Sequence, residues 1–171
     1  MKFSNTLIYW YLQNKRDLPW RKSKNPYFIW LSEIMLQQTR VAQGLSYYIK
    51  FTTAFPTVFD LAKAPESTVL KMWQGLGYYS RARNLHFSAK QLSEELNGVF
   101  PTTYKEIIKL KGIGDYTASA IASICFEEPT AVVDGNVYRT LSRYFGIHTA
   151  INTNAGIKEF KALAQTLLDT S

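Results

Sequence analysis

A helical period of about 3.6 residues recurs along the whole sequence, and no strand-like alternation of apolar and polar residues persists. Proline and glycine interrupt this period at short intervals, at Asn25-Pro26, Pro56, Pro65, Gly75–Gly77 and Asn97-Gly98. These frequent breaks, together with the helical period, argue against a β-sheet. The sequence therefore predicts an all-α fold of about ten short helices joined by tight turns.

The composition allows a core and suggests a polyanionic partner. The chain is 46% hydrophobic and carries a net charge of +7, so nucleic acid is the first partner to consider. Trp10, Trp30 and Trp73 are expected in the core. The single cysteine, Cys125, makes no internal disulfide, and His86 and His148 are too far apart in sequence to suggest a zinc site. No apolar run approaches the ~18 residues of a membrane span, and no signal-peptide pattern is present, which favours an intracellular protein, cytoplasmic or nucleoid-associated.

Two glycines interrupt the helical pattern in LKGIGDYTA, residues 110–118. A Thr103-x-x-Glu106 capping box predicts a helix ending at Leu110, and a new helix begins near Asp115, the expected N-cap. Gly112 can adopt a left-handed conformation, and Gly114 lets the backbone approach another surface. Outward N–H groups at a helix start suit a phosphate, although Asp115 would weaken that contact. The alternative is a plain corner between two helices.

The segment PYFIWLSEIML, residues 26–36, places Glu33 beside an apolar helical arc. A carboxyl group in that position loses hydration, so its pKa should rise, as a general acid near neutral pH requires. The alternative is a boundary glutamate in a salt bridge.

A second acid, Asp134, lies in AVVDGNV, where a loop turns into a helix. An N-cap aspartate held by helix N–H groups stays ionised and can oppose a developing positive charge. One acid with a raised pKa and one anchored carboxylate is an arrangement that cleaves glycosidic bonds, and an N-glycosidic bond is the relevant one for a DNA-binding protein.

Five segments in this order, LPWR, WLSEIMLQQT, GLGYYSRARNLH, LKGIGDYTA and VVDGNV, resemble the MutY-like adenine DNA glycosylases. These belong to the helix-hairpin-helix glycosylase superfamily, together with the endonuclease III-like enzymes. The resemblance is to the N-terminal catalytic region. It implies a base-excision repair enzyme that flips adenine out of double-stranded DNA, where it is mispaired with 8-oxoguanine or guanine, and hydrolyses its glycosidic bond.

The resemblance also implies roles for individual residues. Glu33 would protonate adenine and help position water, Asp134 would stabilise the sugar, and Tyr116 and Asn136 would line the same pocket. The DNA- and base-binding residues would be Trp20, Arg21, Leu36, Gln38, Thr39, Tyr78, Arg81, Gly112 and Gly114, with Gln38 and Tyr78 wedged into the duplex. Backbone carbonyls of Ile108, Leu110 and Ile113 would hold a monovalent cation. Endonuclease III-like enzymes carry a lysine where Tyr116 stands, so the tyrosine implies a glycosylase without strand cleavage.

The implied architecture is a six-helix barrel module over about residues 21–130, with its helix-hairpin-helix at about 103–126. Residues 1–20 and 131–171 would form part of a second helical lobe of a monomer. The family's [4Fe–4S] cluster needs four cysteines, which this chain lacks, and its 8-oxoguanine-recognition domain is also missing. Three alternatives stay open: a thymine–guanine mismatch glycosylase, a non-catalytic DNA-binding module, and a basic helical protein with no nucleic-acid role.

Overall fold

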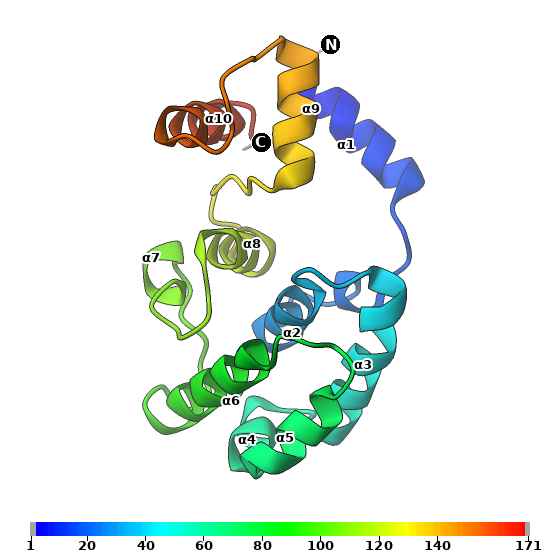
Figure 1. Cartoon of the computed structure of the whole chain (residues 1–171), viewed down its shortest axis with the longest axis vertical. Coiled ribbons are helices and arrows are strands. Elements are labelled where there is room, and N and C mark those ends of the chain that lie inside the picture. The colour runs from blue at the N-terminus through cyan, green and yellow to red at the C-terminus, as the bar shows by residue number, and fades with distance from the viewer. Residues whose placement is uncertain (1–2, 170–171) are drawn as a thin grey trace.

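The computed structural model describes residues 3–169, and its regular structure is helical throughout that range (Figure 1). The elements are α1 (Phe3–Asn14), the 3-10 turn η1 (Pro19–Arg21), α2 (Pro26–Leu36), α3 (Val41–Ala54), α4 (Val58–Lys63), α5 (Glu66–Trp73), α6 (Tyr79–Glu94), α7 (Tyr104–Ile107), α8 (Asp115–Phe126), α9 (Gly135–Phe145) and α10 (Asn154–Thr166). The all-α prediction is confirmed. Within residues 3–169, none of the helices combines the length and the apolarity needed to cross a bilayer.

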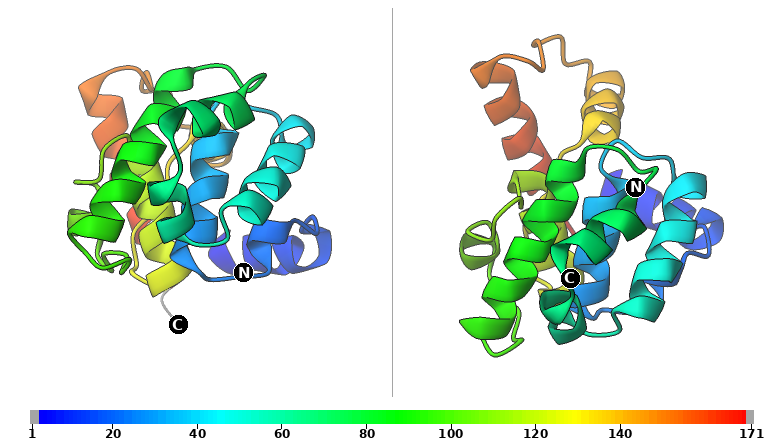
Figure 2. Two further views of the ribbon diagram at one scale, coloured as in Figure 1. Left: turned by 90° about the horizontal axis from the view of Figure 1, so that it is seen from below. Right: turned by 60° about the horizontal axis from the view of Figure 1, so that its bottom comes forward.

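Helix α2 lies at the centre of the larger hydrophobic core. It packs against α3, α6 and α8, and Figure 2 shows it running between α3 and α8. Its side chain Trp30 is fully buried, and Trp73 of α5 is buried against the edge of Phe51 at 5.6 Å between ring centroids. Helix α2 begins as the sequence predicts, because Asn25 accepts a hydrogen bond from the Tyr27 N–H and Pro26 occupies the first helical position. The most buried helix of the fold is therefore the one that carries Glu33.

A second, smaller core joins α9 and α10. Its buried members are Ala131, Leu141, Phe160 and Ala164, and Phe3 of α1 packs against it. Figure 1 shows α1, α9 and α10 gathered apart from α3 to α6. The chain crosses from the larger core to the smaller one through the linker after α8. Leu18 and Trp20 belong to the larger core, so that core begins a few residues before the predicted boundary at residue 21.

Two local predictions fail. Trp10 was expected inside, but it is 57% exposed, and α1 has no buried residue because only its first turn reaches the smaller core. The Thr103–Glu106 capping box does not form: the Thr103 hydroxyl donates to the Glu106 carboxylate at 2.9 Å. Glu128 caps this helix start instead, since its carboxylate accepts from the Tyr104 N–H at 2.6 Å, and the α-helix ends at Ile107.

Candidate active site

A cleft of about 1340 Å³ lies beside the C-terminal half of α2. It is bounded by the segment before α2, the end of α2, the turn before α6, the start of α8 and the start of α9. Most of the predicted site residues line it: Trp20, Arg21, Glu33, Leu36, Gln38, Tyr78, Arg81, Tyr116 and Asp134. Thr39, Asn136, Gly112 and Gly114 are not among its lining residues. Residues from five separated stretches of sequence therefore converge on one cavity.

Glu33 lies in the cleft with its carboxyl group largely shielded from water. Burial raises the pKa of Glu33 to about 7; contact with the Tyr116 hydroxyl lowers this pKa, and the charge of Asp134 raises it. Among residues 3–169 no lysine or arginine forms a salt bridge with Glu33. The predicted rise in the pKa of Glu33 is thus present, and the alternative, a salt bridge to Glu33, is not found among residues 3–169. With this pKa, Glu33 is about half protonated at neutral pH, so it can both give and take a proton.

Asp134 is fixed by the start of α9. Its Oδ1 accepts from the backbone N–H of Val137 at 2.8 Å, which makes Asp134 the N-cap that the sequence predicts. Its Oδ2 accepts from the side-chain amide of Asn136 at 3.0 Å. Asn136 therefore holds Asp134 rather than lining the cavity itself. Both carboxylate oxygens have a hydrogen-bond donor, so the orientation of the carboxylate is fixed.

Tyr116 stands in the first turn of α8, near both acids. Burial, the charges of Glu33 and Asp134 and the contact with Glu33 raise the pKa of Tyr116 to about 12. Its hydroxyl is therefore neutral across the physiological range and can donate a hydrogen bond. A phenol has no amine, so this position cannot form a Schiff base with a sugar.

Gln38 and Tyr78 share an unusual backbone conformation. Gln38 has φ 55° and Tyr78 has φ 48°, both in the left-handed region that residues with a Cβ rarely adopt. That conformation costs about 1–2 kcal/mol per residue. Tyr78 is 66% exposed, so its ring projects from the protein surface. The two residues predicted to wedge into DNA thus occupy strained turns on the cleft.

Arg81 lines the cleft, but its guanidinium is directed at the protein backbone. Its two terminal nitrogens donate to the carbonyls of Ile34, Met35, Gln37, Leu76 and Gly77, with a long contact to the Thr39 hydroxyl. Its charge also faces the ring of Trp73 at 5.4 Å. In the free protein, Arg81 thus forms a bridge between two turns, and its predicted contact with DNA stays a prediction. Thr39 belongs to that bridge.

The two glycines of the hairpin differ in what they require. Gly112 has φ +81°, and a Cβ built there would lie 2.6 Å from the Asn84 Cβ, so no other residue fits without strain. Gly114 has open space around the position of a Cβ and gives α8 no side-chain cap. The first N–H groups of α8 therefore lack a capping side chain, as a phosphate site needs.

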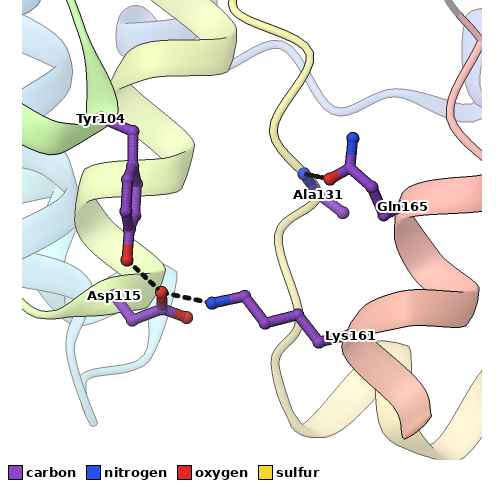
Figure 3. Close-up of polar contacts among 5 residues, drawn as sticks. All are labelled: Tyr104, Asp115, Ala131, Lys161 and Gln165. Carbon is purple, nitrogen blue, oxygen red and sulfur yellow. Dashed lines mark hydrogen bonds and ion pairs between the residues drawn. The ribbon is translucent and has the colours of Figure 1, made fainter. Parts of the chain in front are cut away.

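Asp115 is the first residue of α8 and not its N-cap, which corrects the sequence-based expectation. Figure 3 shows its carboxylate between the Tyr104 hydroxyl and the Lys161 ammonium of α10, with the Lys161 contact at 2.6 Å. Lys161 offsets the negative charge that would repel a phosphate at the hairpin. In the same view, Gln165 of α10 accepts from the N–H of Ala131 at 3.0 Å. These contacts tie α10 to the hairpin and to the linker that leads to Asp134.

The chain does not fit an iron–sulfur cluster. Four cysteine thiolates are needed, and only Cys125 is present; burial and the charge of Glu33 raise its pKa to about 11. Residues 3–169 contain no group of three or more His, Cys, Asp or Glu side chains arranged to hold a metal ion. Of the predicted cation ligands, the Leu110 carbonyl already accepts from the Ile113 N–H at 3.1 Å. The cation site at Ile108, Leu110 and Ile113 stays a prediction.

Sequence reasoning missed a basic rim. Arg16, Lys22 and Lys24 line the cleft, and they lie in the stretch RDLPWRKSK, from which only Trp20 and Arg21 were predicted to belong to the site. Lys22 pairs with Asp17 and Lys24 with Glu127, both on the exposed surface. The signal was available as four basic residues within nine positions.

Comparison with known proteins gives a consistent set of relatives. The profile of the HhH-GPD superfamily base excision DNA repair proteins matches residues 31–165. The chain is 48% identical over 147 residues to an adenine DNA glycosylase of Buchnera aphidicola, covering 85% of this chain and 42% of the relative. It is 44% identical over 176 residues to the adenine DNA glycosylase of Homo sapiens, covering 98% of this chain and 32% of the relative. The chain thus spans less than half of these curated relatives.

Solved structures share the fold. A thermostable thymine-DNA glycosylase superposes with a TM-score of 0.89 at 32% identity, covering 99% of this chain and 78% of that one. An endonuclease III in a non-covalent complex with DNA superposes with a TM-score of 0.79 at 20% identity, covering 99% of this chain and 80% of that one.

Proposed function

Because this chain belongs to the HhH-GPD superfamily of base excision DNA repair proteins, we propose that it is a monofunctional DNA glycosylase acting on adenine mispaired with 8-oxoguanine or guanine. The observation that carries the proposal is the pair of unlike acids in one cleft. Glu33 has a pKa of about 7, and Asp134 is anchored as a carboxylate by the start of α9. The names of the relatives, adenine DNA glycosylases, support adenine as the base.

The proposed reaction uses the two acids at different atoms. A flipped adenosine enters the cleft, because its glycosidic bond is out of reach inside the duplex. Glu33 gives its proton to adenine, the C1′–N9 bond breaks, and the bonding electrons leave with the base. Asp134 opposes the positive charge that develops at C1′. Water then adds to C1′ and returns a proton to Glu33, which leaves an abasic sugar. Tyr116 supplies no amine, so the strand stays intact.

DNA would be held around this cleft by groups of three kinds. The rim of Arg16, Lys22 and Lys24 supplies positive charge, and the uncapped start of α8 supplies N–H donors for a phosphate. Gln38 and Tyr78 would enter the duplex where the adenine leaves it. A monovalent cation on the hairpin carbonyls of Ile108, Leu110 and Ile113 would add positive charge close to the same phosphate.

A thymine–guanine mismatch glycosylase is the second candidate. The thymine-DNA glycosylase that superposes over 99% of this chain at 32% identity favours it, and the two chemistries share the sugar that Asp134 would face. They differ at the base, since adenine offers a basic ring nitrogen for a proton from Glu33 and thymine offers carbonyl oxygens. The two are separated by measuring release from an adenine–8-oxoguanine duplex and from a thymine–guanine duplex.

The test is single-turnover cleavage of an adenine–8-oxoguanine duplex, with alkali either added or omitted before the strands are separated. Cleavage only after alkali supports a monofunctional glycosylase, and Asp134→Asn should abolish it. Cleavage without alkali would contradict the role given to Tyr116. Binding of the duplex without release, by protein that circular dichroism finds helical, would refute the enzyme and leave a DNA-binding module, whose affinity would fall steeply with salt.

A further inference from the structure

Gln38 and Tyr78 are the only cleft-lining residues with a side chain that adopt a left-handed backbone within residues 3–169. Such turns revert easily to an ordinary conformation unless their surroundings hold them. Each lies between helices, Gln38 between α2 and α3 and Tyr78 directly before α6. The two turns come from segments 40 residues apart, so a tertiary contact has to fix one relative to the other.

One guanidinium makes that contact. Arg81 donates to the carbonyl of Gln37, which belongs to the peptide bond that enters Gln38. Its other terminal nitrogen makes a longer contact, 3.4 Å, with the carbonyl of Gly77, which belongs to the peptide bond that enters Tyr78. Both peptide planes that precede the left-handed residues are therefore held by the same side chain. Because the guanidinium is planar and rigid, fixing one plane also fixes the other.

Further contacts anchor Arg81 itself. It bonds the carbonyls of Ile34 and Met35 at 3.0 and 3.2 Å, in the last turn of the helix that carries Glu33. The Trp73 ring lies under its charge, and the Trp73 indole N–H donates to the Gly77 carbonyl at 3.0 Å. The turn before Tyr78 is thus supported from two sides. Arg81 is only partly exposed, and its two terminal nitrogens donate mainly to backbone carbonyls, while its Nε is buried without a hydrogen-bond partner.

We propose that Arg81 is a positioning residue for base flipping: it holds Gln38 and Tyr78 together in their left-handed turns, so that both can enter the duplex when DNA binds. The inference rests on the proposed function for the nature of the substrate. Preorganised wedge residues reduce the ordering that DNA binding would otherwise require. A lysine cannot replace Arg81, because one ammonium with three donors cannot span carbonyls on two turns.

The test compares Arg81→Lys with the wild-type chain in a flipping assay that needs no catalysis. A 2-aminopurine placed opposite guanine brightens when it leaves the stack. We expect Arg81→Lys to reduce the flipped fraction at saturating protein by roughly tenfold, the size of effect that lost positioning can produce. An Arg81→Lys protein that flips as well as wild type would overturn the inference.

Salt dependence separates positioning from a direct phosphate contact. If Arg81 touches backbone carbonyls only, Arg81→Lys and Arg81→Met leave the slope of log affinity against log salt unchanged. The matched control is Arg16→Met on the basic rim, which should reduce that slope by about 1. A similar reduction in Arg81→Met would show that Arg81 binds phosphate and would overturn the assignment.

A second readout compares how much Arg81→Lys slows adenine release from two different duplexes. Adenine opposite an abasic gap has no pairing partner and costs less to flip, so its release should suffer less from Arg81→Lys than release from the 8-oxoguanine mispair. Equal losses on both substrates would mean that Arg81 serves the chemistry or the fold in general.

If Arg81→Lys does not fold, Trp73→Phe removes the second donor to the Gly77 carbonyl and should also lower the flipped fraction. Wild-type protein that flips without releasing adenine would refute the proposed function alone, and wild-type protein that does not flip would refute this inference.

Discussion

Replacing Glu33 with glutamine should make the protein more stable and catalytically inactive. Burial raises the pKa of Glu33 from 4.5 to about 7, so the folded state binds this proton more tightly than the unfolded state does. The stabilisation from that proton is complete below the unfolded value, and it is lost as the pH rises towards and through the folded value. Glutamine does not ionise and carries no such loss. The substitution removes the proposed acid and also removes a buried charge.

The expected change in the free energy of unfolding follows from the pKa values of Glu33 in the unfolded and folded states. The rise from 4.5 to about 7 means that ionised Glu33 lowers the free energy of unfolding by ~3 kcal/mol near pH 8 and by ~1 kcal/mol near pH 5. Other effects of the substitution, such as altered packing or a changed contact with Tyr116, are nearly independent of pH. The stability difference between Glu33→Gln and wild type should therefore grow by ~2 kcal/mol from pH 5 to pH 8.

Urea unfolding followed by circular dichroism at both pH values measures this difference. Glu94→Gln is the matched control, because it makes the same substitution at an exposed position of α6. A gap of the same size at both pH values for Glu33→Gln would refute the reasoning, since it would mean that Glu33 ionises normally in the folded protein. In the wild type, adenine release should fall as the pH rises through about 7, because the acid is then lost.

Other perturbations test the remaining parts of the site. Tyr116→Phe removes a contact that lowers the pKa of Glu33, so an NMR titration of the Glu33 carboxyl should give a higher pKa in the variant; a lower or unchanged value would contradict the contact. Gly112→Ala forces a side chain into a left-handed turn and should lower the free energy of unfolding by about 1 kcal/mol or more. Gly114→Ala meets no atom of the protein, so it should leave stability unchanged while weakening DNA binding in a gel-shift assay. Equal loss of stability for both alanine variants would refute the distinction between the two glycines.

The functional site could be predicted where its chemistry depends on neighbours in sequence. Glu33 has a raised pKa because the helix that carries it is apolar on both flanks, and that pattern is visible in residues 26–36. Asp134 caps α9 because an aspartate before Gly135 and Asn136 has helix N–H groups within reach. Both features arise within one or two helical turns, the range over which sequence patterns are reliable.

The partners of the polar side chains could not be predicted in the same way. Arg81 donates to several backbone carbonyls, including that of Ile34, 47 positions away, and no pattern near Arg81 indicates these acceptors. Asp115 was expected to cap its own helix, but it pairs with Lys161, 46 positions away. A charged side chain takes whichever acceptor or donor the folded chain brings close, and local propensity contains no information about that neighbour.

The sequence by itself determined the helical class, the hairpin with its two glycines and the two acids, because spacing, capping and glycine conformation act over a few residues. Only the tertiary structure decided which of these elements meet. The packing of α2 against α8 brings Glu33 and Tyr116 together, and the linker after α8, held by α10, brings Asp134 to the same cleft. Most of α1 stays exposed. Burial depends on which helix faces cover one another, so it is a property of the assembled chain.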